Sequence, residues 1–144
     1  MKIDIYAHIL PEQYRINLMK EIASLSSSRE MANRANRELE TRLRLMDRFP
    51  EVLQVLTLSL PPLDNELGIK PKKAMQLAKA VNDEVAEIVA QHPDKFVAAV
   101  ACLPLNDMDA ALVETDRAIK ELGFKGVQLF ARVNGEQLDS PRYQ

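Results

Sequence analysis

The chain has 144 residues and a formal net charge of −2, with 47% hydrophobic and 28% charged residues. This length suits one domain with a sizeable core, and the composition is that of an ordinary globular protein. The small net charge and the lack of a basic stripe argue against a nucleic-acid-binding protein, and no apolar run is long enough to predict a transmembrane helix. We expect a single domain over residues 1–144, with neither nucleic acid nor a membrane as partner.

The sequence contains one cysteine, Cys102, which cannot form an intramolecular disulfide. It lies in the apolar run Phe96–Leu103, so we expect a small buried side chain rather than a nucleophile. A lone cysteine fits a reducing compartment, and the first predicted strand starts directly after Met1 and leaves no room for a signal peptide. These features predict a cytoplasmic protein.

The first eleven residues predict a β-strand that ends at Pro11. Apolar and polar side chains alternate with a period of two residues, Ile3, Ile5 and Ala7 against Asp4, Tyr6 and His8. We expect a central strand with His8 at its C-terminal tip. Asp4 shares the polar face, where it either orients a neighbouring side chain or is a buried, hydrogen-bonded carboxylate.

Two helices are expected after this strand, over residues 12–25 and 29–48, separated by the serine-rich break 24–28. On the second helix, glutamates precede arginines by four residues in three pairs, Glu30–Arg34, Glu38–Arg42 and Glu40–Arg44. This spacing is typical of a solvated, salt-bridged helix face, and an anion-binding site is the alternative reading of its arginines.

The rest of the chain alternates apolar strands with amphipathic helices. Strands are expected at 52–60, 96–103 and 126–130, and helices at 72–91 and 108–122, the last with Ala111, Leu112, Ala118, Ile119 and Leu122 facing inward. Residues 138–144 look like the start of a further helix. This order predicts a parallel sheet with right-handed crossovers, either doubly wound or half of a (β/α)8 barrel.

The opening segment Met1–Pro11 resembles the first strand of the metal-dependent amidohydrolase superfamily, in the branch that contains aminocarboxymuconate semialdehyde decarboxylase and the resorcylate-type decarboxylases. In that branch the strand reads roughly Lys-Ile-Asp-x-His-x-His-Ile-Leu-Pro. Residues 93–96, 121–129 and 134–139 are similar to later stretches of the same family, in the same order. The resemblance implies a (β/α)8 barrel, with about the first four β/α units in this chain.

The resemblance also implies a divalent metal ion, with zinc as the expected ion, bound by the paired histidines of the first strand. Here His8 occupies the second position and Tyr6 replaces the first histidine. The family's other ligands, two histidines and a catalytic aspartate, belong to later strands that this chain does not contain. His8 alone is not a metal site, because a site of this class needs several protein ligands.

Four polar residues at or just beyond predicted strand ends are candidate substrate-binding residues on the same rim as His8: Ser59, Asn106, Arg132 and Asn134. The expected function is the N-terminal part of a metal-dependent hydrolase or non-oxidative decarboxylase acting on a small carboxylated substrate, inactive by itself. The alternative is a non-catalytic half-barrel that self-assembles, and a homo-oligomer is expected. A doubly wound binding domain is disfavoured because the sequence lacks a phosphate-binding loop.

Overall fold

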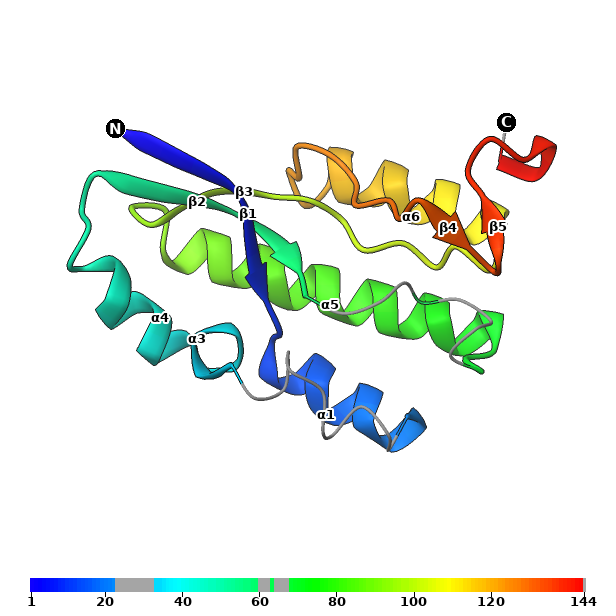
Figure 1. Cartoon of the computed structure of the whole chain (residues 1–144), viewed down its shortest axis with the longest axis horizontal. Helices are drawn as coiled ribbons and strands as arrows, with labels where there is room; N and C mark the ends of the chain where they lie inside the picture. Colours follow the sequence, from blue (N-terminus) through cyan, green and yellow to red (C-terminus); the bar gives the residue numbers. More distant parts are fainter. Residues whose placement is uncertain (23–32, 60–62, 64–67, 144) are drawn as a thin grey trace.

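The computed structural model describes residues 1–22, 33–59, 63 and 68–143 (Figure 1). Its elements, in chain order, are β1 (Lys2–Ile9), α1 (Glu12–Glu21), α3 (Arg34–Arg37), α4 (Leu39–Met46), β2 (Val52–Leu58), α5 (Pro71–Gln91), β3 (Phe96–Ala99), α6 (Met108–Lys120), β4 (Arg132–Val133), β5 (Glu136–Gln137) and a 3-10 turn at Pro141–Tyr143. None of these helices is long and apolar enough to cross a membrane.

The three long strands form a parallel sheet in the order β1-β2-β3, as the alternating pattern predicts. The expected fourth strand is reduced to one parallel bridge between Ala101 and Val127. Next to it, the Gln128 side chain accepts a hydrogen bond from the Leu58 amide at 3.0 Å and donates one to the Leu58 carbonyl at 3.2 Å. The Gln128 side chain therefore connects the segment after α6 to the C-terminal end of β2 through two hydrogen bonds.

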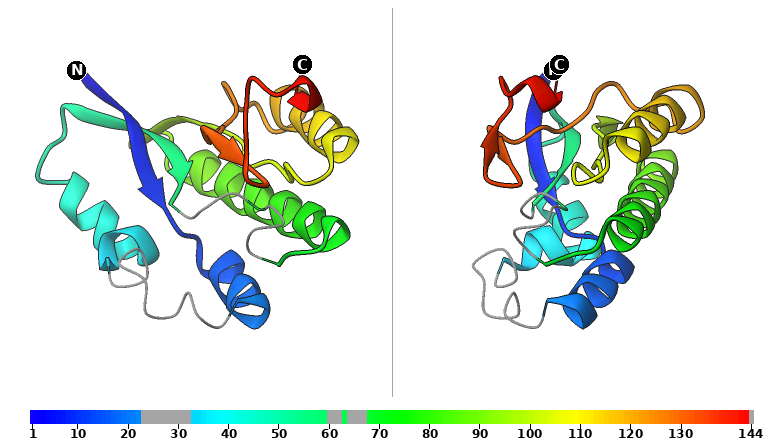
Figure 2. Two further views of the ribbon diagram at one scale, coloured as in Figure 1. Left: turned by 45° about the vertical axis from the view of Figure 1, so that its right-hand side comes forward. Right: turned by 90° about the vertical axis from the view of Figure 1, so that its right-hand side faces the viewer.

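Helix α5 packs its apolar face against the sheet and contributes several residues to the core. Pro71 occupies its first turn, where a proline costs no hydrogen bond, and the predicted apolar stripe is buried, including Ala74, Leu77, Ala78, Val81, Val85 and Ile88. The helix contacts β3, α1 and α6. In the right-hand view of Figure 2, β1 and β2 stand between α5 and α6 on one side and β4–β5 on the other. The described helices thus leave part of the sheet uncovered.

The helix predicted over 29–48 is divided in its described part. Residue Glu38 has φ −111° and ψ 101°, which separates α3 from α4. Glu38 pairs with Arg34 at 2.8 Å and accepts from Thr41, and these hydrogen bonds lower the pKa of Glu38 to about 2. The expected Glu38–Arg42 pair is therefore wrong, and Arg42 points into the protein instead. The Glu30–Arg34 pair and the serine-rich break lie outside the described residues.

Strand β1 is an edge strand rather than the central strand that its sequence suggests, because its described partner is β2 alone. The register with β2 shifts between Asp4 and Ala7, which places a β-bulge in the middle of the strand. The bulge interrupts the alternation of faces. Residues 2–6 are exposed on both faces of the strand, and Ile3 and Ile5 are 48% and 74% exposed instead of buried.

Helix α6 also buries a different set of residues from the expected one. Asp107 caps it as predicted, accepting a hydrogen bond from the Ala110 amide at 3.1 Å. Ala111 and Ala118 face the core, but Leu112 and Ile119 are 65% and 41% exposed, and Glu114 is fully buried. The helix expected at the C-terminal end is a short 3-10 turn.

The buried carboxylate of Glu114 on α6 belongs to a hydrogen-bonded network that also includes Asn82 and the backbone of Cys102. The Asn82 side chain accepts from the Cys102 amide and donates to the Cys102 carbonyl, both at 2.9 Å, and it donates to Glu114 at 2.7 Å. Burial raises the pKa of the Cys102 thiol to about 12, with a smaller contribution from the Glu114 charge. A thiol held protonated in this way agrees with the predicted structural role.

Candidate functional site

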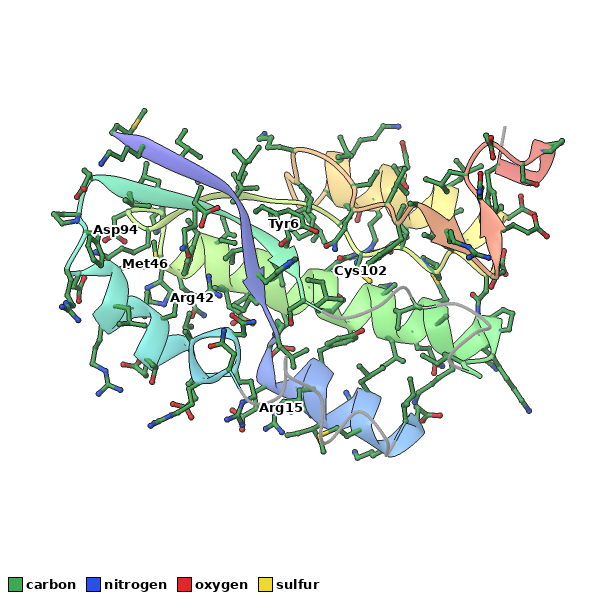
Figure 3. All side chains as sticks on the ribbon, in the orientation of Figure 1. Tyr6, Arg15, Arg42, Met46, Asp94 and Cys102 are labelled. Carbon is green, nitrogen blue, oxygen red and sulfur yellow. The ribbon has the colours of Figure 1, made fainter. Side chains whose placement is uncertain are left out.

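The side chains of Tyr6 and His8 lie next to each other near the C-terminal end of β1. Their ring centroids are 4.5 Å apart and the rings meet edge to face at 62°. Tyr6 is 63% exposed, whereas His8 is partly buried (Figure 3 shows Tyr6). The two positions of the first-strand motif thus share one side of the strand, as a pair of ligands for one ion would require.

Two polar neighbours fix His8 in place. Its Nδ1 atom lies 2.8 Å from the hydroxyl of Thr57, which is the register partner of His8 on β2 and is 3% exposed. Its backbone carbonyl accepts a hydrogen bond from Arg42 of α4. Among the described residues, none donates to or accepts from His8 Nε2, so this nitrogen is the one left for a ligand.

Arg42 is buried to 6% exposure, and its donors bond to neutral oxygens. Besides the His8 carbonyl, they are the Ala35 carbonyl at 3.1 Å and Gln54 Oε1 at 2.8 Å. Burial lowers the pKa of Arg42 to about 10, and the nearby Asp4 charge opposes that shift. Figure 3 shows the side chain between α4 and β1. Arg42 therefore ties α3, α4, β2 and the end of β1 together.

A cavity of about 550 Å³ lies between β1, the start of β2 and the α3–α4 segment. Its lining combines β1 with the α3–α4 segment and the start of β2: Asp4, Tyr6, Ala7, His8, Asn33, Ala35, Asn36, Arg42, Leu45, Met46, Phe49, Val52 and Gln54. Asp4 is exposed and accepts from the Tyr6 amide at 3.1 Å, so it is not the buried carboxylate considered from the sequence. It stabilises the bulge that separates the two halves of β1.

The donor set fits a metal ion only in part. In the part of the chain that the structure describes, no three histidine, cysteine or acidic side chains gather as they would around an ion. His8 offers one free imidazole nitrogen, which suits zinc or manganese. The Tyr6 phenol next to it is a poor substitute for imidazole, because a phenol must lose its proton to bind a metal ion as an anion, whereas a neutral imidazole offers a lone pair. His8 therefore fits one position of a site that further ligands must complete.

The structure does not bring the four candidate substrate-binding residues to the cavity beside His8. Asn106 is 7% exposed and donates to the Ile69 carbonyl at 2.9 Å. Arg132 is exposed on β4 and donates to the Gly135 carbonyl at 2.9 Å. Asn134 has a left-handed φ of 52° in the β4–β5 turn, and Ser59 Oγ is shielded from solvent and has no hydrogen-bond partner among the described residues. Their substrate roles stay predictions.

Sequence reasoning missed Thr57 and Arg42 as the residues that hold His8. The sequence carried a signal for Thr57, because a hydroxyl interrupts an apolar run near the end of the second predicted strand. Choosing between Thr57 and Ser59 needs the strand register, which a bulge in β1 changes. Arg42 carried no such signal, because its spacing from Glu38 matches an ordinary surface ion pair.

The family model described as Amidohydrolase matches residues 3–144 of the chain. The 2-amino-3-carboxymuconate-6-semialdehyde decarboxylase of Dictyostelium discoideum is 27% identical over 98% of this chain and 43% of its own length. The gamma-resorcylate decarboxylase of Rhizobium radiobacter is 42% identical over 67% of this chain and 27% of its own length. The chain therefore spans less than half the length of these relatives.

Solved structures match over the same region. The dihydroxybenzoic acid decarboxylase of Polaromonas, with bound manganese and 2-nitroresorcinol, has a TM-score of 0.65 at 28% identity over 88% of this chain and 37% of its own. The 5-carboxyvanillate decarboxylase of Novosphingobium aromaticivorans has a TM-score of 0.79 over 99% of this chain and 45% of its own, where 21% identity shows the fold alone. The neighbours are TIM barrels, so the sheet is part of a barrel and not a doubly wound sheet. The chain belongs to the amidohydrolase family.

Proposed function

We propose that this chain is the N-terminal part of a metal-dependent decarboxylase or hydrolase that acts on a small carboxylated substrate. The observation that carries the proposal is His8, held at the end of the first barrel strand with Nε2 left free. Barrel enzymes keep their chemistry at this end of the strands. The similarity to resorcylate-type decarboxylases favours decarboxylation of a carboxylated aromatic ring over hydrolysis.

In this proposal His8 would hold a divalent ion through Nε2 as one of several ligands, and the ion would supply Lewis-acid polarisation of the substrate. Manganese is bound in the Polaromonas relative, so manganese and zinc are both candidates for this chain. The described residues supply too few ligands for tight binding. The chain alone is therefore expected to show no turnover, and the remaining ligands must come from further β/α units. A cytoplasmic location stays a prediction.

Replacing His8 with alanine is expected to abolish the weak binding of Mn²⁺ or Zn²⁺ by the purified chain. We expect only weak binding by the wild type, since one imidazole does not make a complete metal site. Isothermal titration calorimetry would measure it. The matched control is His92→Ala, because His92 is the only other histidine and packs against Phe96 at the end of α5. Equal loss in both variants, or turnover by the chain alone, would contradict the proposal.

A second candidate function is self-assembly, which the exposed surface of β1 favours. Met1, Ile3, Ile5 and Tyr6 are 90%, 48%, 74% and 63% exposed, and Leu45 and Phe49, which line the same cavity as Tyr6, are 42% and 54% exposed. An apolar patch along an unpaired strand edge is a surface that monomers avoid. We propose that a second copy covers this patch, with homo-oligomers as the result.

Replacing Ile5 with lysine is expected to weaken self-association about tenfold or more, because a charge on an edge strand opposes pairing. Sedimentation equilibrium over a range of concentrations would measure the dimer dissociation constant. Leu112→Lys is the control, because Leu112 is 65% exposed on α6, away from the β1 edge. A wild-type chain that stays monomeric at every concentration would reject self-assembly.

A further inference from the structure

A second cavity, of about 720 Å³, lies between α1, the α3–α4 segment and α5. It shares no lining residue with the cavity beside His8, so it is a separate feature of the fold. Residues 9–11, which connect β1 to α1, form part of its wall together with Ile88 of α5. Its charged side chains come from α1, α3, α4 and α5, and the proposed function uses none of them.

The arginines of the α3–α4 segment take different roles. Arg34 forms an ion pair with a glutamate of the same segment, and Arg42 points into the protein. Arg37 and Arg44 instead line this cavity, and Arg15 adds a third guanidinium group from α1. Among the ion pairs of the described residues, none joins a carboxylate to any of these three cavity arginines. An anion-binding role is therefore open to them.

Two of these guanidinium groups have a buried donor without an acceptor. The Nε atoms of Arg15 and Arg37 are shielded from solvent and have no hydrogen-bond partner among the described residues. The other contacts of the cavity arginines are weak: Arg15 Nη1 lies 3.8 Å from the sulfur of Met19, and Arg44 donates to Thr41 at 3.3 Å. Buried donors in folded proteins are paired, and an orphan donor calls for a bound water, ion or ligand. Because both donors are cationic, an anion is a better common acceptor than water.

The carboxylates of the lining do not fill this role. Glu38 is held by Arg34 at 2.8 Å. Glu84 accepts from two backbone amides in the first turn of α1, at 3.0 and 3.1 Å, which places its charge at the positive end of that helix. The remaining acidic residues of the lining are exposed, so solvent and salt screen their charge: Glu12, Glu40 and Glu87. The buried part of the cavity therefore presents unpaired donors, whereas its other carboxylates are exposed to solvent.

We propose that this cavity binds a small molecule through an oxyanion group, a phosphate or a carboxylate, which accepts hydrogen bonds from the Nε–H groups of Arg15 and Arg37. A planar guanidinium group can donate two parallel hydrogen bonds to either kind of oxyanion, and Arg44 adds a third positive charge. The volume lies within the range of small-molecule sites, roughly 300–1,000 Å³. The bound anion connects α1 to α3. The site contains no residue of the proposed metal site, so it does not rest on the proposed function.

The test is nitrogen-15 NMR of the arginine side chains while the purified chain is titrated with inorganic phosphate or with malonate at constant ionic strength. The Nε–H signals of Arg15 and Arg37 should shift in a saturable way, because both donors gain an acceptor. Arg34 is the internal reference, because its Nε already donates to Glu38 at 3.0 Å and its signal should not shift. A response to phosphate alone identifies a phosphate site, and a response to malonate alone identifies a carboxylate site.

Replacing Arg37 with glutamine should lower the affinity for the anion that binds by about tenfold or more, the value of one hydrogen bond to a charged group. Arg15→Gln should have a similar effect, so the result does not depend on one variant. Arg48→Gln is the matched control, because Arg48 is exposed just after α4 and lies outside the lining. It removes the same charge without removing a cavity donor. Unchanged backbone amide spectra would show that each variant is folded.

The titration of the wild type can overturn the inference without any variant. If neither anion gives saturable shifts at Arg15 and Arg37, the cavity is not an oxyanion site. Equal shifts at Arg34, or an equal loss of affinity in Arg48→Gln and Arg37→Gln, would also overturn it, because the response would then be general screening of surface charge. His8→Ala should leave the anion affinity unchanged, which separates this site from the proposed metal site.

Discussion

Replacing Tyr6 with histidine is expected to raise the affinity of the chain for Zn²⁺ or Mn²⁺ by about 100-fold or more, because even outer partners of a metal ligand are worth roughly 10–100-fold in affinity. The two rings already lie 4.5 Å apart between centroids on one side of β1. A second imidazole at position 6 would need no deprotonation at neutral pH, unlike the phenol. Calorimetric titration of the wild type and Tyr6→His would measure the difference.

The controls separate a true pair of ligands from a nonspecific gain. Tyr6→Phe keeps the ring without an imidazole and should bind no better than the wild type. In the double variant Tyr6→His, His8→Ala, the gain should be lost, since both imidazoles are needed. Tyr6 is 63% exposed, so none of these changes should unfold the chain. Equal affinities of Tyr6→His and the wild type would mean that the two positions do not point at a common ion.

The architecture could be predicted because helical and strand periodicities are local. The stripe on α5 and the cap at Asp107 are encoded within one or two turns, and both are confirmed. The order of strands and helices then predicts parallel pairing with little else needed. By contrast, the helix predicted over 29–48 is divided at Glu38, and Arg42 donates to Gln54 instead of pairing with Glu38. The contact with Gln54 is tertiary, so local periodicity does not contain it.

The candidate site could be predicted only as far as one strand. The spacing of two residues predicts that His8 and Tyr6 share a side of β1. Their rings are in contact, at 4.5 Å between centroids, although Tyr6 lies within the bulge that interrupts the alternation. The hydroxyl that reaches His8 depends on the pairing of β1 with β2, and a bulge between Asp4 and Ala7 sets that register. A sequence pattern places Ser59 near the rim but contains no information on this register.

Replacing Glu114 with alanine is expected to lower the free energy of unfolding by about 3 kcal/mol, within the range for breaking a buried ion pair from one side. Glu114 is fully buried and receives hydrogen bonds from Arg117 at 2.7 and 2.9 Å and from Asn82 at 2.7 Å. The hydrogen bond with Glu114 is the main reason that the pKa of Arg117 is raised. Without the carboxylate, Arg117 keeps Asp83 at 2.6 Å, so the loss should fall at the low end of that range.

Urea unfolding followed by circular dichroism would measure this loss, with the slope of the free energy against urea unchanged. Asp116→Ala is the matched control on the same helix, because Asp116 pairs with Lys120 at 2.5 Å on the surface with 61% of its side chain exposed. That pair should contribute about 0.5 kcal/mol at most. Glu114→Gln keeps the shape and one oxygen acceptor, so it should restore part of the stability. Equal losses in Glu114→Ala and Asp116→Ala would mean that the network of Asn82, Glu114 and Arg117 does not hold α6 against α5 and the end of β3.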